Sequence, residues 1–243
     1  MSNVEDAVRS RYADKARGFA AGESCCQPDG DCGCCGDYDA EELRRLGLDV
    51  GVSLGCGNPT LLARLEPGQV VLDLGSGAGL DVLLSARRVA PGGHAYGVDM
   101  TDEMLEVANR NRDRAGIANA TFLKGGIDAV PLPDSSVDVV ISNCVINLAE
   151  DKGAVIREAF RVLKPGGLFA VADMVEVETL PAALKQRLDT WAGCISGTIP
   201  VAEYRQIMVD SGFTETEIEV HSTQTMPGGG TIGSAYIRAR KSS

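Results

Sequence analysis

The chain has 243 residues, 44% of them hydrophobic, so it can bury a large core, and its length favours one large domain with an attached segment. Acidic residues outnumber basic ones by 34 to 23, and the resulting formal charge of −11 would repel a nucleic acid backbone. No apolar run reaches the roughly 18 residues of a membrane span, and the charged N-terminus lacks the apolar core of a secretory signal. We therefore predict a cytoplasmic protein that binds neither nucleic acid nor membrane.

The predicted elements begin with a polar helix over residues 4–17 that carries a thin apolar stripe. A stretch rich in Gly and Cys follows up to residue 36 and predicts a loop. From residue 69 onward, strands and helices alternate, which predicts an α/β fold with a mostly parallel sheet covered on both faces. Strands are expected at 70–74, 94–99, 120–124, 137–142 and 167–173, and helices at 78–89, 102–115, 152–163, 181–193 and 200–211, followed by an antiparallel pair of strands at the sheet edge.

The segment VVLDLGSGAGLD places three glycines between a predicted strand and a predicted helix, where missing side chains let backbone N–H groups approach a ligand. Asp99 ends the next strand, 24 residues after Gly75, a position from which a carboxylate can accept hydrogen bonds from ribose hydroxyls. Nicotinamide enzymes and adenosylmethionine enzymes both use this arrangement. The spacing here, G-S-G-A-G followed by Leu80 and Asp81, lacks the third glycine of the nicotinamide fingerprint.

Together with LKPGG before the strand at 167–173, this set resembles the class I, Rossmann-like S-adenosylmethionine methyltransferases. The resemblance implies a seven-stranded sheet with an antiparallel edge strand in a methyltransferase domain over residues 65–243. It further implies that Asp73 and the loop from Gly75 to Gly79 face the methionine half of the cofactor. Asp99 and Met100, at the end of the second strand, would hold ribose and adenine. Ile127 would contact adenine, with Asp128 as a further candidate. The expected cofactor residues are Asp73, Gly75, Ser76, Gly77, Gly79, Asp99, Met100, Ile127 and Asn143.

Eight cysteines are many for a chain without a secretion signal, and they favour metal binding or thiol chemistry over a disulfide framework. Cys144 lies just beyond a predicted strand, at the sheet edge where ligands of such folds bind. Cys56 precedes the first strand in GCGNP, and Cys194 follows a later helix in WAGCISG. Loops and helix ends can bring all three together above the sheet.

The segments GCGNP, ISNCVINLAEDK and WAGCISG resemble the three cysteine segments of the arsenite methyltransferase family, and this similarity covers almost the whole chain. It implies that Cys56, Cys144 and Cys194 bind As(III), with arsenite and methylarsenite as substrates in arsenic detoxification. Soft thiolates suit such a centre, whose lone pair is then directed at the sulfonium methyl of S-adenosylmethionine. Because methyl transfer oxidises arsenic formally, two electrons must come from thiols. The family resemblance implies thioredoxin or glutathione as the external reductant.

Residues 1–64 are expected to hold the N-terminal helix, a cysteine-rich segment and the arsenic-binding loop around Cys56. Family members typically carry a cysteine pair upstream of the first arsenic ligand, and Cys25 and Cys26 resemble it, with Cys26 as the candidate redox partner. The further cysteines Cys32, Cys34 and Cys35 contain one C-x-x-C pair without a second pair or a nearby histidine, which gives little support for a zinc site.

Three other interpretations stay open at the level of sequence. The chain could methylate a carbon or oxygen of a small metabolite such as a quinone. It could sequester metalloid through thiols without catalysis. It could also be a zinc-stabilised, dehydrogenase-like protein that binds a nicotinamide cofactor.

Overall fold

The computed structural model of the chain describes residues 3–20, 38, 41, 43, 47, 55, 57–191 and 194–242. The helices are α1 (Asn3–Ala20), α3 (Pro59–Ala63), α4 (Leu80–Arg88), α5 (Asp102–Ala115), α6 (Lys152–Val162), α7 (Ala182–Lys185), α8 (Leu188–Trp191) and α9 (Val201–Asp210), with a single 3-10 turn, η2 (Ile146–Leu148). The strands are β1 (Val70–Leu74), β2 (His94–Asp99), β3 (Ala120–Lys124), β4 (Val137–Asn143), β5 (Leu163–Glu178), β6 (Phe213–Thr225) and β7 (Thr231–Lys241).

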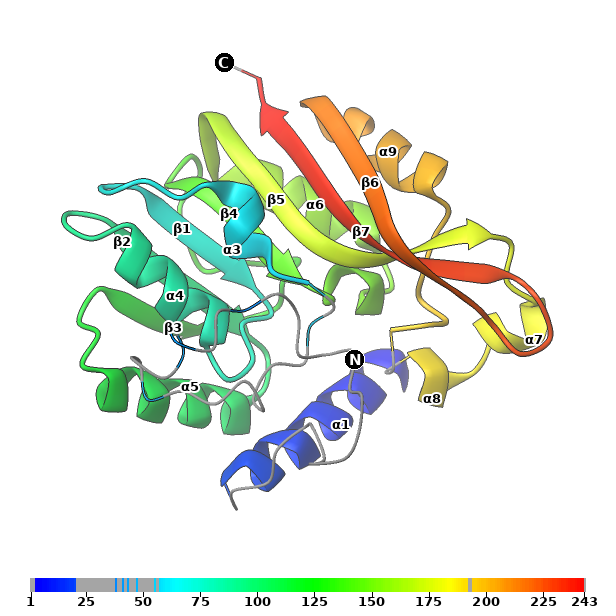
Figure 1. The fold of residues 1–243 in the computed structure, drawn as a ribbon, viewed down its shortest axis with the longest axis horizontal. Coiled ribbons are helices and arrows are strands. Elements are labelled where there is room, and N and C mark those ends of the chain that lie inside the picture. Colours follow the sequence, from blue (N-terminus) through cyan, green and yellow to red (C-terminus); the bar gives the residue numbers. More distant parts are fainter. Residues whose placement is uncertain are drawn as a thin grey trace.

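The strands form one seven-stranded sheet in the order β3-β2-β1-β4-β5-β7-β6 (Figure 1). The first five strands run parallel, while β7 runs antiparallel to both β5 and β6. The chain order reverses beside β1, which is paired with β2 on one side and β4 on the other. Ligands of open α/β sheets bind at such a reversal, outside the carboxyl ends of the strands. The predicted mostly parallel, seven-stranded α/β fold with an antiparallel edge pair is confirmed.

The two faces of the sheet carry separate hydrophobic cores, because side chains alternate between the faces along each strand. Leu72 of β1 and Val140 of β4 belong to one core, and Val71 belongs to the other. The first core is completed by α6 and α9, and the second by α3 and α4. Helices therefore cover both faces, as the alternating pattern of the sequence predicts.

Helix α1 packs across α5 and α8 at one side of the sheet, as Figure 1 shows in blue. Ala16 of α1 lies with Met104 and Val107 of α5 in one small cluster, and Val8 lies with Leu148 in another. The predicted N-terminal helix is thus present and docks through its apolar stripe. No helix in the described ranges is both long enough and apolar enough to cross a bilayer.

The helix expected over residues 181–193 is two short helices, α7 and α8. The reason lies at the carbonyl of Leu184, which accepts hydrogen bonds from the hydroxyls of Ser196 at 2.6 Å and Thr190 at 3.5 Å. Such side-chain donors compete with the backbone N–H groups that would continue a helix. The break leaves the segment after Trp191 free to turn back toward the sheet.

Candidate active site

A cavity of about 340 Å³ opens at the carboxyl ends of β1, β2 and β4. Its volume falls in the range of small-molecule sites, roughly 300–1,000 Å³. The loop after β1, the end of β2, the loop after β3, the end of β4 and helix α1 each contribute to its wall. Among the lining residues are Asp73, Gly75, Ser76, Gly77, Asp81, Asp99, Met100, Ile127, Asp128, Asn143 and Val145.

The glycine loop after β1 has the backbone that its sequence predicts. Gly75, Gly77 and Gly79 all have positive φ, at 71°, 49° and 88°, which glycine adopts without steric cost. A Cβ on Gly75 would lie 2.5 Å from Val145, the residue after Cys144, so the backbone of the loop packs directly against the Val145 side chain. A Cβ on Gly77 would meet nothing within 4 Å, and this residue faces the cavity with room for a ligand.

Among the carboxyl groups that line this cavity, three have raised pKa values: Asp73, Asp81 and Asp99. Burial raises the pKa of Asp81 to about 6, and burial followed by the charges of Asp81 and Asp99 raises the pKa of Asp73 well above its usual range. Asp99 accepts hydrogen bonds from Gly77 N at 2.9 Å and Thr101 N at 2.8 Å, which partly offset a pKa increase caused by burial. No cation of the described residues hydrogen-bonds these carboxyl groups, so they suit a positively charged ligand.

Asn143, the last residue of β4, joins the cavity to the segment around Cys56. Its Nδ2 donates to Gly57 O at 2.6 Å and to the Tyr38 hydroxyl at 3.0 Å. Gly57 N donates to Asn143 Oδ1 at 3.3 Å, and a Cβ on Gly55 would collide with this side chain. Both sequence neighbours of Cys56 therefore lie against the residue that precedes Cys144. Cys56 itself lies outside the described residues.

Cys144 and Cys194 come together from segments 50 residues apart, because Cys194 Sγ donates to Cys144 O at 3.4 Å. Cys144 stands between Asn143 and Val145, which both line the cavity. Both cysteines have left-handed backbones, with φ of 58° and 64°, an uncommon conformation outside glycine that tends to occur at functional sites. Cys194 is a free thiol, whereas Cys144 is disulfide-bonded in the structure.

The Cys194 thiol is packed against the hydrophobic cluster that holds Val8 of α1. Its side chain hydrogen-bonds those of Tyr12 and Asn147, while burial and the nearby Asp173 raise the pKa of the thiol to about 12. Tyr12 also lines the cavity beside Asp99. The helix thus spans the two halves of the site, a role that its polar sequence does not signal.

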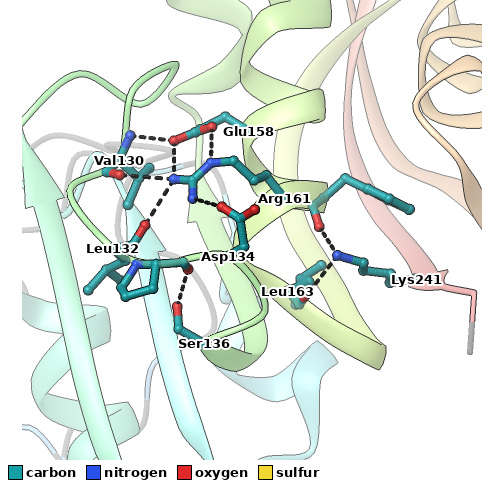
Figure 2. Close-up of polar contacts among 10 residues, drawn as sticks. Val130, Leu132, Asp134, Ser136, Glu158, Arg161, Leu163 and Lys241 are labelled. Carbon is teal, nitrogen blue, oxygen red and sulfur yellow. Dashed lines mark hydrogen bonds and ion pairs between the residues drawn. The ribbon is translucent and has the colours of Figure 1, made fainter.

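The far end of the cavity is formed by the segment after β3, which holds Ile127 and Asp128. Arg161 of α6 fixes the continuation of this segment, since its guanidinium donates to the carbonyls of Val130 at 3.1 Å and Leu132 at 3.0 Å. Glu158 accepts from Arg161 and from Val130 N at 2.7 Å, as Figure 2 shows. These contacts attach the loop to α6 rather than to the sheet.

Comparison with known proteins decides the family. Residues 65–212 match the model of a methyltransferase domain family. The chain is 40% identical over 231 residues to the arsenite methyltransferase of Halobacterium salinarum, covering 88% of this chain and 58% of that protein. It superimposes on the crystal structure of an arsenic(III) S-adenosylmethionine methyltransferase from Chlamydomonas reinhardtii with a TM-score of 0.69 and 31% identity, over 86% of this chain and 72% of that one.

The chain belongs to the arsenite methyltransferase family. A second relative, the arsenite methyltransferase of Aquipseudomonas alcaligenes, is 40% identical over 171 residues, covering 68% of this chain and 49% of that protein. The chain thus spans about half the length of the curated relatives it matches.

The predicted site residues can now be placed. All the expected cofactor residues except Gly79 line the cavity, and Gly79 begins α4 beside it. Cys144 and Cys194 meet at its edge. Cys26, Cys56 and the other N-terminal cysteines lie outside the described residues, and no cluster of metal-ligating side chains occurs in the part of the chain that the structure describes. Tyr12, Asn147 and Asp173 are not identified as site residues from the sequence. Asn147 and Asp173 lie near the ends of expected strands, which is their only signal, and Tyr12 has none.

Proposed function

We propose that this chain transfers a methyl group from S-adenosylmethionine to As(III) held by the thiols of Cys56, Cys144 and Cys194. The observation that carries the proposal is the meeting of Cys144 and Cys194 beside a cavity built for a cationic ligand. Two cysteines assembled from distant segments suit a soft centre once both are reduced, because thiolates bind such centres more strongly than carboxylates do. Membership in the arsenite methyltransferase family supports the same substrate.

The cavity fits S-adenosylmethionine in charge and shape. Asp73 is only 3% exposed and, among the described residues, has no hydrogen-bond partner, so a ligand that brings an ammonium group would satisfy it. Bound S-adenosylmethionine supplies an electrophilic methyl on a positively charged sulfur. Asp99 lies where ribose hydroxyls would be expected, and Ile127 offers an apolar wall for adenine.

The thiols bind arsenic by exchange with its hydroxyls. Each As–S bond forms as one As–OH bond breaks, and the thiol proton leaves with the hydroxide as water. Because the thiolate is the attacking species, the exchange is expected to become faster toward mildly alkaline pH, although it releases no net proton. The bound arsenic keeps its lone pair, and the short path from Cys144 to the cavity lets that lone pair attack without diffusion of either reactant.

Methyl transfer uses the lone pair of arsenic and formally raises its oxidation state by two, so two electrons must return arsenic to the trivalent state. Oxidation of two thiols to a disulfide supplies them, and Cys26 is the proposed N-terminal partner. An external thiol reductant, thioredoxin or glutathione, would then restore the thiols. A reductant is also needed because the Cys144 sulfur must be reduced before it can bind arsenic.

We further propose a division into a thiol-bearing segment at 1–64 and a methyltransferase domain at 65–243. Methylarsenite would be the second substrate and detoxification the biological role, in the cytoplasm. The domain model that begins at residue 65 supports the boundary.

The proposal is tested by incubating the reduced protein with arsenite, radiolabelled S-adenosylmethionine and a thiol reductant, then separating arsenic species by chromatography with elemental detection. Labelled methylarsenicals are expected. If the protein binds the cofactor and no arsenic species gains label, arsenic is not the acceptor. Quinone precursors would then be screened, because 112 residues also match a demethylmenaquinone methyltransferase of Listeria welshimeri at 34% identity.

A further inference from the structure

Two turns carry the cysteines, and they are locked to each other by contacts on the described chain. The first turn, residues 144–148, follows β4, and the described residues of the second, 191 and 194–197, lie at and beyond the end of α8. Cys194 Sγ donates to Cys144 O at 3.4 Å, and Trp191 Nε1 donates to Leu148 O at 3.0 Å. A Cβ on Gly197 would lie 2.0 Å from Asn147 O, so the second turn rests directly on the backbone of the first.

Besides the hydrogen bond from Cys144 N to Ala172 O at 2.8 Å, the first turn is attached to the sheet through a buried pair, Asn147 and Asp173, each 1% exposed. Asp173 lies in β5 and accepts from both the backbone N of Asn147, at 3.0 Å, and its Nδ2. Met174 N and the Tyr204 hydroxyl complete the carboxylate's hydrogen bonds, at 2.8 and 3.5 Å. A buried carboxylate with this many donors holds its partner rigidly.

The contact with Asp173 uses the amide nitrogen of the Asn147 side chain but not its oxygen. Its Oδ1 is buried and has no hydrogen-bond partner among the described residues. A buried oxygen without a partner is destabilising, so attachment to Asp173 alone does not explain an amide at this position. The same amide lies beside the thiol of Cys194, on the turn whose Gly197 packs against the Asn147 carbonyl.

We propose that Asn147 is a positioning residue for the arsenic site: anchored on Asp173, its amide directs the Cys194 sulfur toward arsenic and holds the Cys144 turn in register with it. This inference rests on the proposed function. It adds to the thiol ligands a residue that acts through them and that contacts neither cofactor nor reacting methyl group.

Trp191 makes the inference measurable because it is the only tryptophan of the chain and packs in one cluster with Cys194. Titration of the full-length, reduced protein with arsenite, followed by Trp191 fluorescence, reports arsenic binding without turnover. Asn147→Ala is expected to weaken arsenite binding at least about tenfold, the equivalent of about 1.4 kcal/mol. Affinity for S-adenosylhomocysteine is expected to stay within about twofold, since Asn147 does not line the cofactor cavity.

The double variant Asn147→Asp, Asp173→Asn swaps the two side chains and so distinguishes positioning of the thiol from support of the turn. It restores one amide and one carboxylate in contact, so the Tm is expected to recover most of what either single substitution loses. It also places a carboxylate rather than an amide beside Cys194, so arsenite binding is expected to remain at least about tenfold weaker than in the wild type. Recovery of arsenite affinity along with Tm would mean that the pair only supports the turn, which overturns the proposal.

Asn119→Asp is the matched control, because Asn119 also uses its amide to hold backbone carbonyls, those of Ala86 and Gly93, at the opposite end of the sheet. It should lower the Tm and leave arsenite binding unchanged. Unchanged arsenite affinity in Asn147→Ala would reject the inference while the wild type still methylates arsenite. Absence of arsenite binding in the wild type would instead reject the proposed function.

Discussion

The cofactor half and the thiol half of the site are built in different ways. The cofactor half is centred on one continuous stretch, residues 73–81, and is completed by the end of β2, the loop after β3 and the end of β4. The thiol half is assembled from four separate places, namely Tyr12, the turn after β4, Asp173 and Cys194. A local motif therefore marks the centre of the first half, whereas only the tertiary structure shows what supports the second.

Backbone conformation separates the halves in the same way. The cofactor loop uses glycine at each of its left-handed positions, where this backbone carries no steric cost. The thiol half places Cys144 and Cys194 in the same left-handed region, which costs a residue with a Cβ about 1 kcal/mol or more. Their hydrogen-bonded and packed surroundings hold these two cysteines in place, so the thiol half should be the more sensitive to substitution.

The largest expected effect is that of removing one sulfur. Cys194→Ser should abolish arsenite methylation and leave the affinity for S-adenosylhomocysteine nearly unchanged, because a hydroxyl is a poor ligand for As(III) and Cys194 lies outside the cavity wall. Methylation assays and calorimetric binding of S-adenosylhomocysteine measure the two halves separately. Cys144→Ser should behave in the same way.

Asp99→Asn is the reciprocal control for these cysteine variants. It should weaken cofactor binding while arsenite still quenches or shifts Trp191 fluorescence, because Asp99 contacts the glycine loop and not the second cysteine turn. Normal arsenite turnover in either cysteine variant would contradict the three-thiol scheme.

The difference between the halves also sets the limit of what the sequence predicts. Alternating strands and helices predict the order of elements and the parallel sheet, because periodicity records which face of each element is buried. The glycine loop and Asp99 are predictable because their chemistry depends on local backbone. The roles of Asn147 and Asp173 depend on a contact between residues 26 positions apart, which no local pattern encodes.

A smaller expected effect concerns the charge of the cofactor half. Burial raises the pKa of Asp81 from 3.8 to about 6. Between these two pH values, Asp81 is therefore protonated in the ligand-free folded protein and ionised in the unfolded chain. Its contribution to stability is therefore present below pH 3.8 and is lost as pH rises to about 6. Ionised Asp81 attracts the sulfonium, so binding of S-adenosylmethionine should tighten as pH rises toward about 6 and then level off.

The measurement is the Kd of S-adenosylmethionine at several pH values, compared with Asp81→Asn. At one pH unit below the pKa of Asp81, the wild type should bind about tenfold more weakly than at its plateau, whereas the variant should show a flatter profile. S-adenosylhomocysteine lacks the positive sulfur and should depend less on pH. Equal pH profiles for the wild type and Asp81→Asn would assign the charge dependence to Asp73 or Asp99 instead.

The smallest expected effect tests whether the cofactor half also depends on distant support. Arg161 holds the Val130 and Leu132 carbonyls, but its side chain is one-third exposed, so solvent screens much of its charge. Arg161→Ala should therefore weaken S-adenosylmethionine binding only a few-fold, equivalent to about 1 kcal/mol, without changing arsenite affinity. Arg157→Ala is the matched control on the same helix, because Arg157 is largely exposed and, within the described ranges, pairs only with Asp151, at 3.7 Å. If Arg161→Ala weakened arsenite binding as well, the two halves would be coupled through α6. They would then be distinct in the sequence but not independent in the folded protein.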